Sequence, residues 1–264
     1  ERLIDSARTV PELTLDVILV DDGSTDGTSD AIRSRYPGVK ILEGDGSLFW
    51  SRGMHLAMAA AMRGRPDFLL WLNDDTLLRA HALADLLAQY ARIAAGREII
   101  LIGATANEAG GLSYGGVVAR SHWRRFNFRK VWNPTEPVEC EAMNGNVVLL
   151  PMALVRVVGN LDPVYEHALG DIDYALMARK AGYRVVVSPG FVGTCNNNPQ
   201  SGTFLDGSLP LRVRWGKMLS RKGLPLRSWA HFTRKHASLL WPAYFIQPYV
   251  KLLVSTLMGG LKRG

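Results

Sequence analysis

The sequence predicts an α/β fold in which helices flank a mainly parallel central sheet, with a helical extension at the C-terminus. The 264 residues suit one large α/β domain or two small ones, and 47% hydrophobic beside 21% charged residues is typical of a packed globular protein. From Leu13 to Val187 short apolar runs alternate with helical segments, as in βα units. The alternation stops after Pro189, so we expect one region at residues 1–200 and a second at residues 201–264.

The first part of the chain is expected to contain three strands, each followed by a loop and a helix. Continuous apolar runs predict strands at residues 17–20, 39–42 and 68–72. Segments rich in helix-forming residues predict helices at residues 29–35, 51–62 and 80–94.

The second part continues this pattern around one stretch of different character. Strands are predicted at residues 99–103, 147–150 and 183–187, and helices at residues 152–158 and 171–181. Gly182 is expected to cap the last of these helices. Residues 110–132 are rich in glycine and aromatic side chains, and two interpretations stay open for them: an antiparallel excursion, or a loop that contacts a substrate.

Positive charge is concentrated in the last quarter of the chain. The formal net charge is +7, yet residues 201–264 alone contain eleven Lys or Arg and one acid, Asp206. Apolar residues lie between these charges, in Leu239–Ile246 and Leu252–Val254. This combination favours contact with an anionic membrane surface, and packing of helices on their own domain is the alternative. Nucleic acid is not an expected partner, because residues 1–200 are net acidic.

No segment has the pattern of a membrane-spanning helix. Residues 238–260 form the longest apolar stretch, but Pro242 and Pro248 interrupt it. The start of the chain lacks a signal-peptide pattern. Cys140 and Cys195 belong to no CxxC pair, which favours a reducing compartment. We therefore expect a cytoplasmic location, peripheral to the inner face of the cell membrane.

Two pairs of acidic residues follow predicted strands directly. Asp21 and Asp22 end one strand, and Asp74 and Asp75 end another. Because ligands bind outside the carboxyl ends of parallel strands, these four carboxylates are the first candidates for a site. Neighbouring like charges are costly without a cation, and Mg²⁺ or Mn²⁺ prefers carboxylate and phosphate oxygens. The competing interpretation is that these residues only form turns and helix caps.

A third acidic pair opens the helix predicted at residues 171–181. Asp171 and Asp173 are two positions apart and should point to different faces of the helix, so one is expected to face the cleft as a general base. Gly46 belongs to a glycine-containing loop that suits close approach of a phosphate, or forms an ordinary turn. The sequence lacks a complete dinucleotide fingerprint, a P-loop, a GxSxG turn and an HExxH helix, which excludes the corresponding enzyme classes.

Three segments resemble motifs of family 2 glycosyltransferases with the GT-A fold. Val17–Thr28 resembles their nucleotide-binding segment. Leu70–Thr76 resembles their metal-binding DxD motif, with Asn in the first place. Gly170–Leu176, followed by Ala178–Val185, is similar to the segment whose Asp is the catalytic base. The resemblance covers Asp16–Val187, with the three motifs in the order of the family.

The resemblance implies a metal-dependent, inverting transfer of a hexosyl or deoxyhexosyl group. The donor would be a nucleotide-diphospho-sugar and the acceptor a glycan or a lipid-linked glycan, as in synthesis of cell-envelope polysaccharides. Asp171 would be the catalytic base, and Asp75 would hold Mg²⁺ or Mn²⁺ on the donor diphosphate. The implied donor-binding residues are Asp21, Asp22, Gly46, Arg52 and Asp74. The implied acceptor-binding residues are Asn144, Gly145 and Asp173.

Three departures from the family pattern accompany the resemblance. The family begins with a strand and a helix, of which residues 1–10 would be at most the helix tail, so we expect the N-terminal strand to be missing. Gly170 stands where the family often has Glu, so the pKa of Asp171 is expected to be perturbed less. Thr194–Asn198 stands where the family often offers a His ligand, which leaves the third metal ligand open.

Two other functions stay open beside sugar transfer. A nucleotidyltransferase shares this type of fold and metal chemistry, but it leaves Asp171 without a role. A non-catalytic glycan-binding or membrane-binding module agrees with the missing strand and the basic C-terminal region.

Overall fold

The computed structural model describes residues 1–121, 123 and 125–261, with side chains described up to Ser255. The helices are α1 (Arg2–Ala7), α2 (Thr28–Arg35), α3 (Phe49–Ala61), α4 (Ala82–Ala94), α5 (Met152–Val158), α6 (Gly170–Lys180), α7 (Leu211–Leu219), α8 (Leu226–His236) and α9 (Trp241–Leu261), with short 3₁₀ helices η1 (Met62–Gly64) and η3 (Ser238–Leu240). The strands are β1 (Ile18–Asp21), β2 (Lys40–Glu43), β3 (Phe68–Leu72), β4 (Leu77–Leu78), β5 (Ile99–Ile102), β6 (Thr105–Ala106), β7 (Leu112–Tyr114), β8 (Gly116–Ala119), β9 (Phe128–Val131), β10 (Val138–Glu139), β11 (Ala142–Met143), β12 (Val147–Pro151), β13 (Arg184–Val187) and β14 (Gly193–Thr194).

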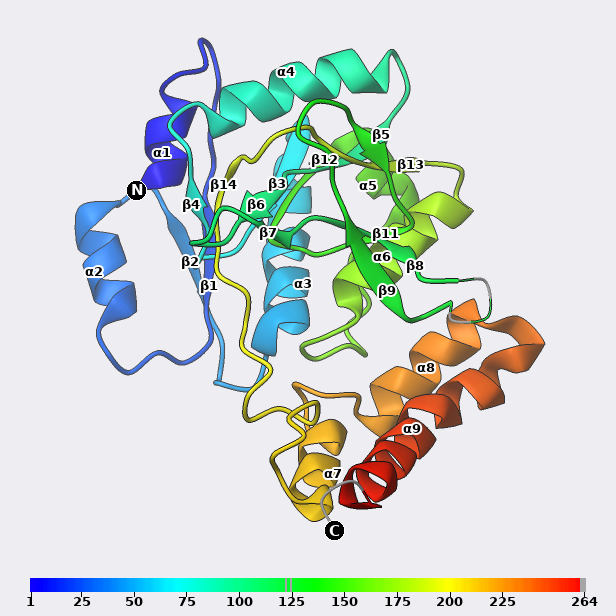
Figure 1. Ribbon diagram of the computed structural model, residues 1–264. Coiled ribbons are helices and arrows are strands. Elements are labelled where there is room, and N and C mark those ends of the chain that lie inside the picture. Colours follow the sequence, from blue (N-terminus) through cyan, green and yellow to red (C-terminus); the bar gives the residue numbers. More distant parts are fainter. Residues whose placement is uncertain (122, 124, 262–264) are drawn as a thin grey trace.

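The central sheet has five strands in the order β10-β13-β5-β12-β3, and helices cover it (Figure 1). The predicted α/β fold is confirmed, but the prediction of a mainly parallel sheet is wrong. In this sheet β13 and β5 are parallel, whereas β12 is antiparallel to both of its neighbours. A continuous apolar run indicates a buried strand without indicating its direction, so the pattern of β12 did not reveal the reversal. A separate parallel pair is formed by β1 and β2.

The stretch around residues 110–132 is an antiparallel excursion, as the first of the two interpretations held. β8 pairs antiparallel with β9 and with β11, and β7 pairs antiparallel with β6. The excursion lies between β5 and β12 in the chain, and its last turn leads into β12. It therefore places Asn144 and Gly145 at one end of the central sheet.

The two faces of the central sheet support separate apolar clusters. Alternate residues of β12 point to opposite faces, as expected for a strand. Val148 and Leu150 belong to the cluster with α3, α5 and α6, while Val147 and Leu149 belong to the cluster with α4. The burial of both faces explains why β12 is apolar throughout.

The C-terminal helices pack on their own chain through a third apolar cluster. Met218, Trp229, Phe232 and Tyr249 bury their side chains there together with Leu169, which precedes α6. In Figure 1 α7, α8 and α9 gather at the lower end of the molecule, beside α6 and β9. No helix of the described residues has the length and apolar character needed to cross a membrane.

Candidate active site

Residues from distant segments meet around the indole ring of Trp50, in the first turn of α3. Its Nε1 donates a hydrogen bond to Oδ1 of Asn73 at 2.7 Å. Gly145 lies against the ring, because a Cβ atom there would be 2.3 Å from two ring carbons. The amide of Gly145 donates to Oδ2 of Asp171 at 3.0 Å. These contacts bring the second and third acidic segments of the sequence to one place.

The first acidic segment reaches the same place through Asp22. Its two carboxylate oxygens accept hydrogen bonds from the amides of Gly46 and Phe49, both at 2.9 Å. Phe49 precedes Trp50, so the loop after β1 is tied to the start of α3. Gly44 is required here, because a Cβ atom at that position would lie 2.5 Å from Oδ1 of Asp22.

Asp21 supports this loop from inside. It is 8% exposed, and its oxygens accept hydrogen bonds from the amide of Ser24 at 2.8 Å and from the hydroxyl of Ser29. Hydrogen bonds from Ser24 and Ser29 lower the pKa of Asp21. The open, ligand-facing carboxylate that the sequence suggested for Asp21 is therefore corrected to a buried support of the loop.

Arg52 is held against the loop that leads to α6. Its Nε donates to the carbonyl of Pro163 at 3.1 Å, and its guanidinium lies 3.3 Å from Glu166. Arg221, which follows α7, lies 3.2 Å from the other oxygen of Glu166 and 5.1 Å from the ring centre of Phe49. The sequence analysis did not identify Glu166 or Arg221 as site residues. For Arg221 the nearest signal was the concentration of positive charge in residues 201–264, and for Glu166 no signal was found. Two guanidinium groups beside one carboxylate leave positive charge next to the loop of the site.

Asp74 and Asp75 are exposed where β3 ends. The sulfur of Cys195 lies 3.5 Å from Oδ1 of Asp75, and Nδ2 of Asn146 lies 3.5 Å from the same sulfur. Burial raises the pKa of the Cys195 thiol. Asn73, the first residue of this motif, is turned toward the indole ring instead of outward. The two carboxylates therefore remain the open groups of this segment.

The donor atoms of this segment suit a cation that is shared with a bound phosphate. Mg²⁺ and Mn²⁺ accept one or two carboxylates and take their remaining ligands from phosphates and water, as exposed Asp74 and Asp75 allow. A protonated thiol such as that of Cys195 is a poor ligand for these hard ions. The described residues contain no cluster of three His, Cys, Asp or Glu side chains suited to a metal. The third ligand that the sequence left open is thus not found among them.

Asp171 is held by two backbone amides at the start of α6. Ile172 donates to its Oδ1 at 2.8 Å, and Gly145 donates to its Oδ2. Burial raises the pKa of Asp171 to about 6. This shift needs no neighbouring acid, which the expectation based on Gly170 did not take into account. A Cβ atom at Gly170 would lie 2.7 Å from Oγ of Ser51, so a larger residue does not fit there without rearrangement.

Asp173 points away from the site, and the expectation that it binds an acceptor is wrong. It is 3% exposed and accepts hydrogen bonds from Tyr165, Lys235 and His236. The spacing of two residues separates Asp171 and Asp173 onto different faces of α6, as predicted. The face of Asp173 is the one covered by α8.

Asn144 lies beside Gly145 at the end of β11. Its amide donates to the carbonyl of Gly115 at 3.1 Å, which fixes the turn before β12. Its side-chain Oδ1 is buried and has no hydrogen-bond partner among the described residues. A buried acceptor without a hydrogen-bond partner is energetically costly.

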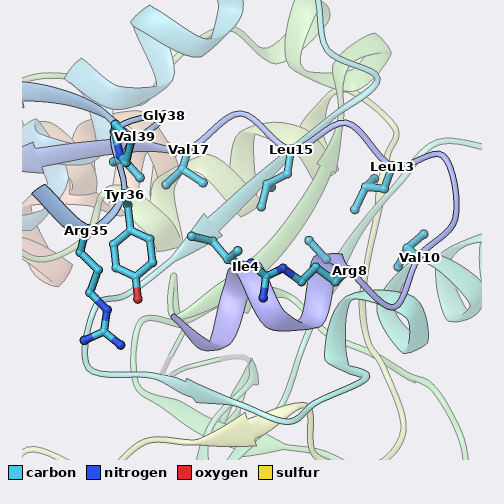
Figure 2. Close-up of a pocket in the computed structure, with 12 residues that line it drawn as sticks. Ile4, Arg8, Val10, Leu13, Leu15, Val17, Arg35, Tyr36, Gly38 and Val39 are labelled. Carbon is cyan, nitrogen blue, oxygen red and sulfur yellow. The ribbon is translucent and has the colours of Figure 1, made fainter. Parts of the chain in front are cut away.

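One surface cavity lies away from these residues. It measures about 470 Å³ and lies between α1, the segment before β1 and the end of α2. Figure 2 shows Leu13, Leu15 and Val17 along one side of it and Tyr36 and Val39 near one end. Its lining contains no carboxylate, so it lacks the groups that the chemistry of the Asp171 site needs.

The comparisons with known proteins agree on one kind of protein. The model of a family described as glycosyl transferase family 2 matches residues 1–146, more than half of the chain. An N-acetylglucosaminyl-diphospho-decaprenol L-rhamnosyltransferase from Mycobacterium tuberculosis is 27% identical in an alignment of 213 residues, which covers 72% of this chain and 69% of that protein.

Solved structures show the fold. GalNAc-T7, crystallised with UDP, GalNAc and Mn²⁺, matches 91% of this chain and 51% of its own with a TM-score of 0.52 and 15% identity. TarS of S. aureus matches 89% of this chain and 40% of its own with a TM-score of 0.52 and 16% identity. The chain thus spans about half the length of GalNAc-T7 and less than half the length of TarS. These likenesses support the predicted GT-A type of fold.

Proposed function

The chain belongs to glycosyl transferase family 2, and from this premise we propose that it is an inverting enzyme whose general base is Asp171. A nucleotide-diphospho-sugar is the donor, and a hydroxyl of a lipid-linked glycan is the acceptor. The observation that carries the proposal is the series of contacts from Asn73 through Trp50 and Gly145 to Asp171. These contacts link a carboxylate with a raised pKa to Asn73, the residue that precedes the exposed acids Asp74 and Asp75.

The proposed reaction requires a base that is ionised near neutral pH and held in place. Asp171, with a pKa of about 6, is mostly ionised at pH 7 and still basic enough to accept a proton. The acceptor hydroxyl passes its proton to Asp171 while its oxygen bonds to the anomeric carbon. The bond between that carbon and the donor diphosphate breaks, and the nucleoside diphosphate leaves. The amides of Gly145 and Ile172 keep the carboxylate in one orientation throughout.

The donor is proposed to bind between the loop of Asp22 and the end of β3. Asp22 and Gly46 line the nucleoside side, and Arg52 supplies positive charge. Asp75, supported by Asp74, would hold Mg²⁺ or Mn²⁺, which neutralises charge on the departing diphosphate. The structure of GalNAc-T7 with UDP and Mn²⁺, on the same type of fold, supports this assignment.

The acceptor is proposed to be a sugar joined through a diphosphate to a polyprenol. The name of the mycobacterial relative describes such an acceptor and an L-rhamnosyl group as the sugar transferred. In this chain Asn144 adjoins Gly145, whose amide holds the base, and the Oδ1 atom of Asn144 has no hydrogen-bond partner among the described residues. This makes Asn144 and Gly145 the acceptor side of the site.

The C-terminal region is proposed to contact the membrane that contains such an acceptor. Residues 1–200 would form the catalytic domain and residues 201–264 the contact region. Ile246 and Val250, 56% and 45% exposed, belong to an apolar face of α9 in a strongly basic segment. Cys140 and Cys195 are both unbridged, which supports a location at the cytoplasmic, inner face of the membrane.

Calorimetric titration with UDP, GDP and dTDP, each with and without Mn²⁺, tests the donor class. We expect one nucleotide to bind in a metal-dependent way, and Asp75→Ala to abolish the metal dependence. Sugar transfer from the matching donor to N-acetylglucosaminyl-diphospho-decaprenol then tests the reaction. Transfer that is unchanged in Asp171→Asn would remove Asp171 from the mechanism, and pyrophosphate release from a nucleoside triphosphate would indicate a nucleotidyltransferase instead.

A further inference from the structure

The residue before α6 has a strained backbone. Leu169 has φ = +78°, in the left-handed region that residues other than glycine rarely adopt. Its side chain is 8% exposed and belongs to the apolar cluster that contains Met218, Trp229 and Phe232 of the C-terminal helices. The strain is thus offset by packing against α7 and α8, two residues before Asp171.

The residue two positions after the base is also held by the C-terminal helices. Oδ1 of Asp173 accepts hydrogen bonds from Tyr165 at 3.0 Å and from Nε2 of His236 at 2.7 Å. Its Oδ2 accepts one from Nζ of Lys235 at 2.8 Å. A carboxylate that is 3% exposed depends on such partners, because an unpaired charge is strongly disfavoured in the protein interior.

The same face of α8 meets a second carboxylate. Nε2 of His231 lies 2.8 Å from Oδ2 of Asp162, and Nζ of Lys235 lies 3.5 Å from the same oxygen. Lys235 therefore bridges Asp162 and Asp173, which stand before and within α6. Helix α8 therefore contacts the loop that precedes Asp171, through Asp162, and the part of α6 that follows Asp171, through Asp173.

We propose that α8 is a positioning element for Asp171, and that Lys235 and His236 act as positioning residues through Asp173. The inference rests on the proposed function, since it concerns the base of that reaction. The first turn of α6 is fixed on one side by Leu169 and on the other by Asp173, and Asp171 lies between them. A displacement of a catalytic group by about 1 Å can lower a rate by about 100-fold, so the contacts that fix Leu169 and Asp173 should affect turnover directly.

Lys235→Met and His236→Leu test the proposal, with Lys180→Met as the matched control. Lys180 is an exposed lysine in the last turn of α6, outside the network. Turnover is measured as nucleoside diphosphate release with N-acetylglucosaminyl-diphospho-decaprenol and UDP-, GDP- and dTDP-sugars. We expect about a 10- to 100-fold lower kcat in both variants, with unchanged nucleotide affinity and unchanged donor KM. Lys235→Arg and His236→Gln, which keep a donor, should restore most of the rate.

Hydrogen exchange gives a readout that does not depend on turnover. The amides of residues 169–173 should exchange faster in Lys235→Met, while those of β12 stay protected. Unchanged kcat and unchanged exchange in both variants would overturn the inference. A loss of kcat together with an equal loss of nucleotide affinity and of exchange protection in β12 would also overturn it, because it would show a general loss of structure. If Asp171→Asn also leaves turnover unchanged, the proposed function fails. If Asp171→Asn is inactive and Lys235→Met is not, the inference alone fails.

Discussion

The backbone amide of Gly145 donates a hydrogen bond of 3.0 Å to Oδ2 of Asp171 and so joins the turn before β12 to the first turn of α6. The same glycine has no room for a side chain, because the ring of Trp50 covers it. The orientation of Asp171 therefore depends on a backbone group and on an aromatic ring from two other parts of the chain. The glycine requirement follows from this arrangement, and the pH dependence follows from the burial of Asp171.

The acid limb of the pH–rate profile should report Asp171. Burial raises its pKa to about 6, and the base acts only in its ionised form. We expect kcat/KM to rise with pH through a midpoint near pH 6 and to level off about one pH unit above it. Initial rates between pH 4.5 and 8.5 provide the measurement, and Asp171→Asn should lower the plateau by about 100-fold or more. A wild-type profile that is flat from pH 5 to 8 would contradict this assignment.

Asp171→Asn should also change stability in a pH-dependent way. The raised pKa means that the folded protein binds a proton more tightly than the unfolded chain, whose carboxyl has a pKa of 3.8. The wild type therefore loses stability as pH rises from about 4 to about 6, by at most about 3 kcal/mol. The Asn variant lacks this loss, so it should gain stability relative to the wild type between pH 4 and pH 7.5. Urea unfolding at the two pH values measures the difference, and equal differences at both would contradict the prediction.

Gly145→Ala should destabilise the protein and slow the reaction. A Cβ atom there would lie 2.3 Å from two carbons of Trp50, so the ring must move away from Asn73 and the turn away from Asp171. Overpacking of this kind costs roughly 1–3 kcal/mol. Gly38→Ala is the control, because a Cβ atom at that position meets nothing within 4 Å.

The double variant Trp50→Ala with Gly145→Ala separates the steric effect from other effects. Removal of the ring should recover part of the stability lost in Gly145→Ala, although the hydrogen bond to Asn73 is lost as well. Thermal unfolding of the four proteins in the cycle measures the coupling. Additive losses would show that the close contact between the ring and Gly145 is not the cause.

The sequence predicted helices and strands well where one local pattern was decisive. Apolar runs and helix-forming segments indicated β3, β12 and α6, whose bounds differ from the predictions by at most about one residue. The direction of β12 was not predictable in this way, because it depends on how the excursion before it returns to the sheet. The alternation of strands and helices predicted parallel strands, but the antiparallel excursion before β12 reverses the direction of that strand.

The candidate site was predictable as a set of acids but not as an arrangement, and the roles of these acids stay predictions. The motifs indicated Asp22, Asp75 and Asp171, yet nothing local marked Trp50, whose contacts lie far away in the chain. The spacing of Asp171 and Asp173 predicted different faces of α6. Which face α8 would cover depended on long-range packing, and this is why Asp173 was wrongly placed in the acceptor site.

The exposed apolar face of α9 should determine binding to anionic membranes. Ile246, Val250, Leu253 and Val254 recur at helical spacing and are exposed, while Tyr249 and Leu252 on the other face are buried. We expect the wild type to sediment with vesicles that contain phosphatidylglycerol at low salt, and less at high salt, because basic residues contribute.

Ile246→Glu combined with Val250→Glu should weaken this sedimentation by about tenfold or more, since two apolar contacts are lost and two like charges face the lipid. Both side chains are exposed, so thermal unfolding should hardly change. Val157→Glu is the control, because Val157 is 63% exposed on α5, away from this face. A double variant that sediments as the wild type does would exclude α9 as the contact. If vesicle binding is lost while Asp171-dependent turnover persists on an acceptor in detergent, the membrane contact serves access to the acceptor and not the chemical step.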